Sequence, residues 1–365
     1  MRTGPRTRAR GPRPGRASLR AAERAGVLGA VLLLTLLLAV PAGAAPSSPQ
    51  DRCPVTDRRL VELSGLAVAA EGGVWAMSDG GSRVALYRLD PGSCAVVETR
   101  TAALDPFDAE DLAIAPDGAF WVADTGDNDR LRDTVALLVL PPDGAPRLHR
   151  LTYPDGPHDA EALLIGADGV PVIVTKEVGG TAGVYRPAGP LAEPGPTPLM
   201  RAGSAGFPRS ETRGGPIGAL GAFTVTGGAT SAGREVVALR TYTDAWLYRV
   251  PASGDLVAAL QATPLQVPLP AEPQGEALAF LPDGTLLSGS ETRGPDRGRL
   301  RAVPGAVEAT LAAAPAEPTV APPPATPPEP APDWLPAAIG VGVAVLVLGL
   351  AAAAMALHGR RRSRV

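Results

Sequence analysis

Apolar and polar residues follow a recurring pattern along the middle of the chain. Each unit has a short apolar run, a turn that often contains Asp-Gly, and then a second apolar run. Asp-Gly between apolar runs is a strong hairpin signal, because Gly accepts the positive φ of a tight turn. A third apolar run often follows, as in residues 84–89, 134–140 and 245–250. Five units are visible, the fourth weaker than the others: residues 62–79, 108–124, 159–176, 225–240 and 274–290.

The recurring units predict an all-β fold, a β-propeller. Units of about 40–50 residues with three or four strands are typical of propeller blades. The five visible units favour five blades within residues 45–303, mainly over 53–303. Six blades are the alternative, because residues 177–224 could contain a divergent unit, and a β-sandwich is the alternative architecture. No long stretch with a helical period occurs outside the two ends of the chain.

The N-terminal segment predicts export from the cytoplasm. Residues 1–44 are interpreted as a signal peptide with an Arg-rich start and a short apolar run over 26–40. Ala42-Gly43-Ala44 then provides a small-residue cleavage site. An uncleaved anchor helix is the alternative for this segment.

The C-terminal part predicts a stalk and one transmembrane helix. Residues 304–333 are rich in Pro, Ala, Glu and Thr and cannot build a core. Residues 334–357 are uncharged and long enough to cross a bilayer, and the Arg-rich tail 358–365 follows. Because positive residues stay on the cytoplasmic side, we expect a single-pass protein of the cell membrane. Its residues 45–303 would lie outside and its C-terminus in the cytoplasm.

The distribution of charge limits the classes of ligand, and the two cysteines indicate a disulfide. The formal net charge is −3, but Arg gathers at the two ends and leaves the middle of the chain strongly acidic. An acidic surface argues against nucleic acid and for cations or neutral ligands. Cys53 and Cys94 both lie in the part that we expect outside the cell, which favours a disulfide between them. Two free thiols or a metal site are the alternatives.

Acidic residues recur at two equivalent places in the units. One set precedes the first apolar run and another follows the second, and in a propeller both places face one mouth of the central channel. Clustered carboxylates with an amide oxygen suit Ca²⁺. The alternative is structural, because Asp and Glu at hairpin ends often cap turns or bind neighbouring backbone. The acidic residues are Glu62, Asp79, Asp108, Glu110, Asp111, Asp124, Asp127, Asp159, Glu161, Glu177, Asp244, Glu276 and Glu291, and Asn128 provides the amide oxygen.

Three residues near these acids are candidates for catalysis. Lys176 is the only lysine of the chain, and it could stabilise an oxyanion or pair with Glu161. Arg240 holds the analogous place in the next unit, with a buried salt bridge as its alternative role. His158 could shuttle a proton, or it could be an ordinary loop histidine. The segment 124–128, Asp-Thr-Gly-Asp-Asn, could bind a cation or form a tight turn.

The chain resembles exported bacterial β-propeller proteins of uncharacterised function, especially actinobacterial ones. It is also similar to the broader calcium-dependent propellers, which include gluconolactonase-type lactonases and propellers with phytase or esterase-like activity. In the lactonase type, a channel Glu, Asn and Asp hold the catalytic calcium. The stretches that carry the resemblance are residues 108–113, 124–128, 153–164, 239–244 and 273–278. The resemblance implies Ca²⁺ as cofactor, held by Glu110, Asp124, Asn128, Glu161 and Glu276.

Two classes of function follow from this sequence. In the first, a membrane-anchored extracellular propeller hydrolyses a lactone or an ester in an acidic pocket, with Lys176 or Arg240 at the oxyanion. In the second, the same surface binds a cell-wall glycan, a small molecule, a peptide or a protein without chemistry. Convergence of Glu110, Glu161 and Glu276 favours the enzyme. The sequence has no G-x-S-x-G, H-E-x-x-H, P-loop or G-x-G-x-x-G motif.

Overall fold

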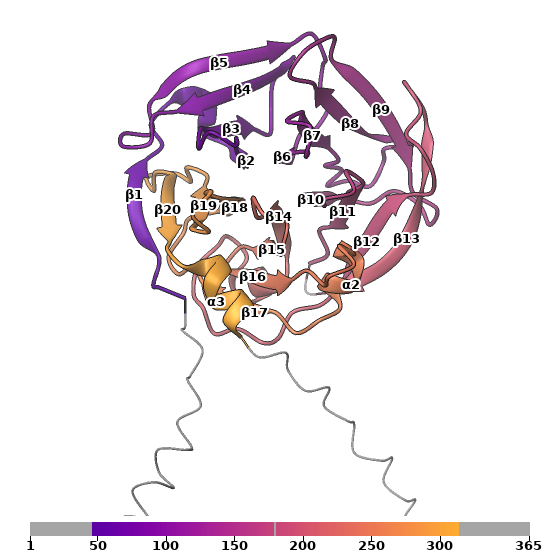
Figure 1. The fold of residues 1–365 in the computed structure, drawn as a ribbon. Helices are drawn as coiled ribbons and strands as arrows, with labels where there is room; N and C mark the ends of the chain where they lie inside the picture. Colours follow the sequence, from indigo (N-terminus) through magenta and orange to yellow (C-terminus); the bar gives the residue numbers. More distant parts are fainter. Residues whose placement is uncertain (1–45, 179, 314–365) are drawn as a thin grey trace, which may run out of the picture. The chain divides into compact units, whose positions relative to one another are not determined.

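The strands of the protein surround a central axis (Figure 1). A computed structural model describes residues 46–178 and 180–313. The strands β2, β6, β10, β14 and β18 lie innermost, and their sheets extend outward from the axis (Figure 1). The fold is therefore the β-propeller that the recurring units predict, and not a pair of stacked sheets.

Strands that follow one another in the chain pair antiparallel in groups of four. The first group comprises β2 (Leu63–Val68), β3 (Val74–Ser78), β4 (Val84–Leu89) and β5 (Val96–Ala102). The second comprises β6 (Asp111–Ile114), β7 (Phe120–Asp124), β8 (Val135–Leu140) and β9 (Arg147–Thr152). The third comprises β10 (Ala160–Ile165), β11 (Pro171–Thr175), β12 (Ala182–Pro187) and β13 (Thr197–Ala205). The fourth comprises β14 (Val225–Thr230), β15 (Val236–Thr241), β16 (Asp244–Arg249) and β17 (Leu265–Pro268).

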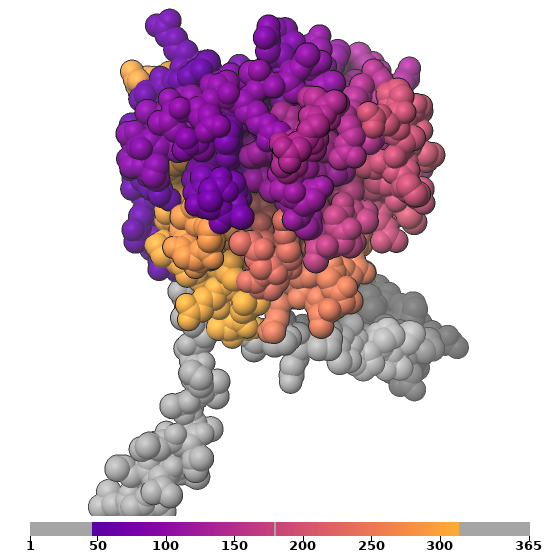
Figure 2. All heavy atoms as spheres, turned by 45° about the horizontal axis from the view of Figure 1, so that its top comes forward, coloured from indigo at the N-terminus to yellow at the C-terminus, as the bar shows by residue number. Residues whose placement is uncertain are grey.

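A strand from the start of the described chain completes the last group. β18 (Gly275–Phe280), β19 (Leu286–Ser290) and β20 (Arg299–Val303) are joined by β1 (Gln50–Pro54), which pairs antiparallel with β20. In Figure 2 the indigo of the first strands accordingly meets the orange of the last ones. The ring is thus closed by segments from opposite ends of the described residues.

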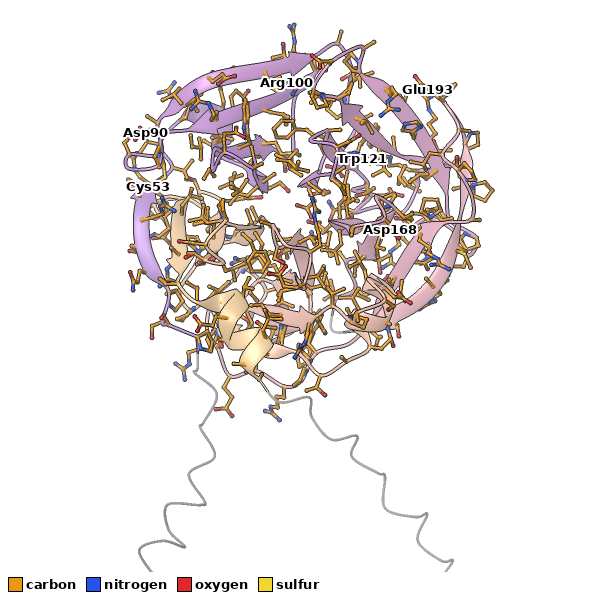
Figure 3. All side chains as sticks on the ribbon, in the orientation of Figure 1. Cys53, Asp90, Arg100, Trp121, Asp168 and Glu193 are labelled. Atoms are coloured by element: carbon orange, nitrogen blue, oxygen red, sulfur yellow. A yellow bond between two sulfur atoms is a disulfide. The ribbon has the colours of Figure 1, made fainter. Side chains whose placement is uncertain are left out.

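The predicted disulfide is confirmed. Cys53 of β1 is bonded to Cys94, which lies in the turn between β4 and β5, and the two Cα atoms are 5.8 Å apart. Cys53 lies at the outer rim of the molecule, near Asp90 of the same turn (Figure 3). The bond therefore ties the closing strand to the first group of four.

The described residues of the region 177–224 supply outer strands and no further group of four. It contributes β12, β13 and the short helix η2 (Gly218–Ala222). β13 also pairs parallel with β9, which joins the second and third groups into one eight-stranded sheet. The other described helices are η1 (Arg58–Leu60), α2 (Leu256–Leu260) and α3 (Ala306–Ala312).

The Asp-Gly turns form the predicted hairpins. Gly118, Gly169 and Gly284 have φ values of 82°, 71° and 82°, which Gly adopts without steric cost. The Asp117 carboxylate accepts a hydrogen bond from the backbone N–H of Ala119 at 3.0 Å, and the other two turns repeat this bond. These turns join the innermost strand of a group to its second strand.

Apolar side chains fill the spaces between neighbouring groups. Trp75 of β3 and Phe120 of β7 pack edge to face, with ring centroids 5.2 Å apart. Ala306 and Val307 of α3 are buried in the cluster beside β15 and β16. The folded part thus continues past residue 303, where the sequence placed the start of the stalk.

The segments predicted for export and anchoring, 1–44, 334–357 and 358–365, lie outside the described residues. Within 46–178 and 180–313, no helix has the length and apolar character that a membrane crossing needs.

Candidate cation site at the channel mouth

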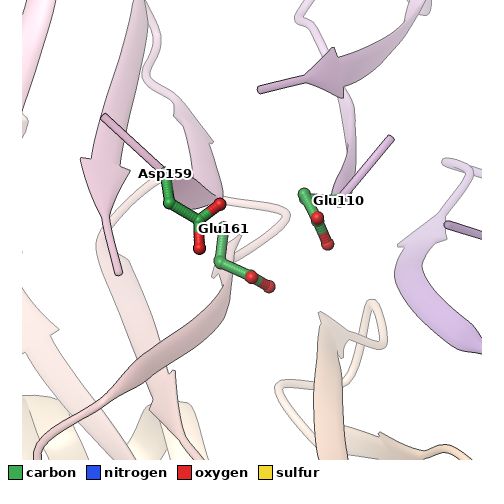
Figure 4. Close-up of side chains that lie close together, drawn as sticks. All are labelled: Glu110, Asp159 and Glu161. Atoms are coloured by element: carbon green, nitrogen blue, oxygen red, sulfur yellow. The ribbon is translucent and has the colours of Figure 1, made fainter. Parts of the chain in front are cut away.

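Three buried carboxyl groups meet near the axis (Figure 4). Glu110 stands just before β6, Asp159 just before β10, and Glu161 within β10. One oxygen of each residue lies within 4.8 Å of the other two. We call these three residues the acidic cluster. It combines side chains from two groups of strands that are consecutive in the chain.

A bulge in the innermost strands places Glu161 and its equivalents. The pairing of β10 with β11 shifts register between Ala160 and Ala162, so Glu161 is the extra residue. The same shift in β18 falls at Glu276. Bulges re-aim side chains and are frequent beside functional sites. The equivalent positions of the five units are Ser64, Glu110, Glu161, Thr226 and Glu276.

Lys176 neutralises part of this negative charge. It follows β11, and its ammonium donates a hydrogen bond to Oε1 of Glu161. The other oxygen of Glu161 is buried and has no hydrogen-bond partner among the described residues. Oε1 of Glu276 accepts a hydrogen bond from Gln274 at 3.0 Å, whereas its buried Oε2 also lacks a described partner. Such oxygens are costly to bury, so each of them favours a proton or a cation.

Burial governs the protonation of the acidic cluster. It raises the pKa of Glu161 to about 7, although the charge of Lys176 acts in the opposite direction. Burial also raises the pKa of Glu110 well above its usual range, and the charge of Glu161 adds to this rise. The pKa of Asp159 is raised by burial, against the N–H of Asp127 that donates to it. At neutral pH the cluster therefore favours bound protons or a cation over three free carboxylates.

The ammonium of Lys176 keeps its charge in this setting. Burial lowers its pKa, but the charges of Glu161, Tyr242 and Glu276 outweigh burial, and the net direction is upward. Its Nζ also lies 6.0 Å from the centroid of the Tyr242 ring. A fixed positive charge thus stands against the carboxyl groups of the channel.

Further acids surround the cluster. Burial, followed by the charges of Asp79 and Glu62, raises the pKa of Glu291 to about 8. Burial and the charge of Glu62 raise the pKa of Asp79 to about 6. Burial and the charge of Asp159 raise the pKa of Asp108. These acids thus oppose one another's ionisation, because the charge of each raises the pKa of its neighbours.

Three of the residues predicted to bind metal, Asp124, Asn128 and Glu276, lie outside the acidic cluster. The Asp124 carboxylate accepts hydrogen bonds from the backbone N–H of Asp108 at 2.8 Å and of Phe107 at 3.1 Å, and it pairs with Arg132. Asn128 is exposed. The carboxylate of Asp127 likewise accepts backbone N–H groups, of Leu131 and Arg132, and a turn follows over residues 127–130. The carboxylates of this segment thus hold neighbouring backbone.

Arg240 takes the structural role that the sequence left open. It is fully buried, and its guanidinium donates to Glu272 and, at 2.5 Å, to the hydroxyl of Ser288. His158 also makes contacts apart from the acidic cluster. Its Nε2 lies 3.1 Å from both Asp155 and the hydroxyl of Tyr185. Neither side chain is therefore directed at the three carboxyl groups.

Asp159 is the cluster member that the sequence did not assign to a metal. Its signal was its place two residues before Glu161, as Asp108 stands two residues before Glu110. Asp111 is the contrasting case, because its buried carboxylate accepts backbone N–H groups of β6, β10 and β14 at 2.8 to 3.1 Å. Asp111 therefore connects three innermost strands and has a structural role.

Comparison with solved structures finds enzymes of several kinds. A gluconolactonase from Xanthomonas campestris is 14% identical with a TM-score of 0.39, over 71% of this chain and 87% of that one. The PQQ-bound aldose sugar dehydrogenase from Streptomyces coelicolor is 11% identical with a TM-score of 0.38, over 72% and 99%. A luciferin-regenerating enzyme is 15% identical with a TM-score of 0.39, over 67% and 78%. No protein-family model and no curated protein matches the sequence. Likeness at this level transfers no activity, so the function is argued from the site.

Proposed function

We propose that the acidic cluster binds one divalent cation, Ca²⁺, and that the protein hydrolyses a lactone or an ester at this mouth of the channel. The convergence of three buried carboxyl groups within 4.8 Å carries the proposal. Carboxylate oxygens are the donors that Ca²⁺ prefers, and water can complete its coordination. Glu161 has an oxygen free of described partners for such a ligand role. One ammonium against three carboxyl groups leaves a negative charge that a divalent cation offsets.

The residues around the cluster suit acyl transfer to water. When bound, the cation would act as a Lewis acid toward a carbonyl oxygen. Glu276 is the general base that takes the proton of the attacking water, because its buried Oε2 has no described hydrogen-bond partner and is free to accept that proton. Lys176 donates an N–H to the developing oxyanion. The proton on Glu276 passes to the leaving alkoxide as the acyl C–O bond breaks.

The cation is tested on the full-length protein by thermal unfolding after chelation, with CaCl₂ or MgCl₂ added back. A cation at about 100 times its Kd stabilises the folded state by about 2.7 kcal/mol. We expect this rise with Ca²⁺, and we expect Glu161→Gln to remove it. Glu193→Gln is the matched control, because Glu193 lies exposed at the outer rim (Figure 3). No rise with either cation contradicts the site.

Hydrolysis is tested with a panel of lactones and aryl esters. Turnover should require Ca²⁺ and fall at least about a hundredfold in Glu276→Gln, as for loss of a general base. That variant should still show the calcium-dependent stabilisation. Calcium binding without turnover would leave a binding propeller for a cell-surface ligand and overturn the hydrolase.

We also take the propeller to have five blades. The strand order supports this count, because it gives groups of four with β1 completing the last one. Five hydrophobic clusters, each between neighbouring groups, support it as well. The acidic cluster then joins two adjacent blades.

The location at the cell membrane is likewise our proposal. The apolar runs 26–40 and 334–357 support it, as does the disulfide, which oxidising compartments favour. Protease added to intact cells should digest the propeller, while a tag on the C-terminal tail stays protected. A tag that is cut in intact cells would overturn this orientation.

A further inference from the structure

The end of the channel opposite the acidic cluster opens into a cavity of about 780 Å³, which we call the far cavity. Its lining includes hairpin turns that join innermost and second strands, together with apolar residues of the innermost strands such as Val68, Ile114 and Ala229. Its volume is within the range of small-molecule sites. The site proposed for hydrolysis does not use it.

An arginine stands in the far cavity without a carboxylate partner. Arg234 lies in the turn between β14 and β15 and donates hydrogen bonds to the carbonyl oxygens of Ile165 at 2.7 Å and Ile114 at 2.9 Å. No carboxylate of the described residues lies within 4.0 Å of its guanidinium. Burial lowers its pKa. Carbonyl oxygens satisfy two N–H groups, but they do not neutralise the charge.

The backbone at Arg234 is also unusual. Its φ is 63°, in the left-handed region that residues with a side chain adopt at a cost. The corresponding turns of other units place Gly in that conformation, at Gly118, Gly169 and Gly284. The fourth unit thus departs from the repeat where it contributes a charge to the far cavity.

Other hydrogen-bond donors in the far cavity lack acceptors. The Trp75 side chain is buried, and its Nε1–H has no described partner. The hydroxyl of Thr230 lines the same cavity and also lacks one. Arg100 adds a second positive charge to the lining, and the acid of the lining, Glu71, is exposed.

We infer that the far cavity binds a small organic anion with an apolar body, of the class of medium-chain carboxylates. The carboxylate pairs with Arg234, and the hydrocarbon chain lies along the apolar residues of the lining. Charge complementarity selects the anion, because the guanidinium has hydrogen bonds but no counter-ion. The apolar lining favours a ligand that carries a hydrocarbon chain. This site is independent of the proposed hydrolysis at the other mouth.

The test compares octanoate with octan-1-ol, which has the same chain length and no charge. Isothermal titration of the full-length protein should show one octanoate per chain, bound at least tenfold more tightly than octan-1-ol. Arg234→Gln should weaken octanoate at least tenfold and leave octan-1-ol unchanged. Arg186→Gln, an exposed arginine on β12, is the matched control and should bind both as the wild type does.

A measurement without a variant guards against a failure of Arg234→Gln to fold. On the wild-type protein, NaCl at about 0.5 M should weaken octanoate and spare octan-1-ol, because salt screens only the charged ligand. Equal affinity for the two ligands, or no octanoate binding, would overturn the inference. Arg234 would then only connect the backbones of Ile114 and Ile165.

Discussion

Arg240 depends on a neighbouring residue that has no side chain. Its buried guanidinium lies against Gly275, where an added Cβ would overlap Nη2. The pairing with Glu272 therefore requires glycine at this position of β18. Displacing one partner would leave the other as an uncompensated buried charge.

Gly275→Ala should consequently be strongly destabilising. We expect a loss of about 3–5 kcal/mol in the free energy of unfolding, the usual result of breaking a buried pair. Urea unfolding measures it. Gly206→Ala is the control, since nothing lies within 4 Å of a Cβ added there, and it should change little. A loss below about 1 kcal/mol in Gly275→Ala would show that Arg240 can move aside.

The sequence could identify some site residues and not others. Glu110 and Glu161 were predictable because the repeat places them at equivalent positions of consecutive units. Asp124 and Asn128 belong to a motif that also offers several side-chain oxygens. In the structure, however, Asp124 holds backbone N–H groups and Asn128 is exposed. Residue type does not reveal which carboxylate already has partners, since those partners come from other loops.

At the scale of elements, β1 matters more than its length indicates. It completes the last group of strands, and its partner β20 lies at the other end of the described chain. The disulfide from Cys53 to Cys94 holds β1 to the first group as well. Two neighbouring groups therefore depend on a strand of five residues.

Replacing both cysteines by serine should weaken this closure. The separation of 41 residues corresponds to about 3–4 kcal/mol on the chain-entropy estimate. Urea unfolding of Cys53→Ser/Cys94→Ser should show a loss of that size. Dithiothreitol should lower the wild type to the level of the variant and leave the variant unchanged. A variant as stable as the oxidised wild type would contradict this prediction.

The inner hairpins could be predicted from the sequence, whereas the outer elements largely could not. Asp-Gly between apolar runs fixes a local turn, so β6 with β7 and β10 with β11 follow from short segments. β12 and β13 lack that signal. The pairing of β1 with β20 joins residues as distant as Asp51 and Arg299, which are 248 positions apart. Such pairing depends on the closure of the whole ring.

The whole molecule places opposite chemistry at the two ends of one channel. β6 begins directly after Glu110 of the acidic cluster and ends at Ile114, whose carbonyl accepts a hydrogen bond from Arg234. β10 likewise connects Glu161 to Ile165. The same two strands therefore position both a group of carboxyls and an unneutralised guanidinium.

The acids at the channel mouth should make the protein less stable as pH rises. Glu291, with a pKa of about 8, and Asp79, with about 6, keep protons in the folded state that the unfolded chain releases near pH 4. The folded state binds more protons between about pH 4 and 8, so stability is full below this window and falls through it. In chelator, the melting temperature should drop from pH 5 to pH 8.5.

Glu291→Gln should flatten that decline, because it removes the carboxyl group that has the higher pKa of the two. Glu211→Gln, at an exposed position, should leave it unchanged. A melting temperature that rises over this range would contradict the conclusion that Glu291 and Asp79 keep their protons in the folded state.

The pairing of β1 with β20 has a consequence for biosynthesis. Among the described strands the ribosome makes β1 first and β20 last, so the ring cannot close until β20 has been made. Hairpins of the early groups can form in order, but β1 must wait with an unpaired edge, which is prone to wrong pairing. Cys94 is synthesised soon after Cys53, so their bond can hold β1 beside its group until β20 arrives.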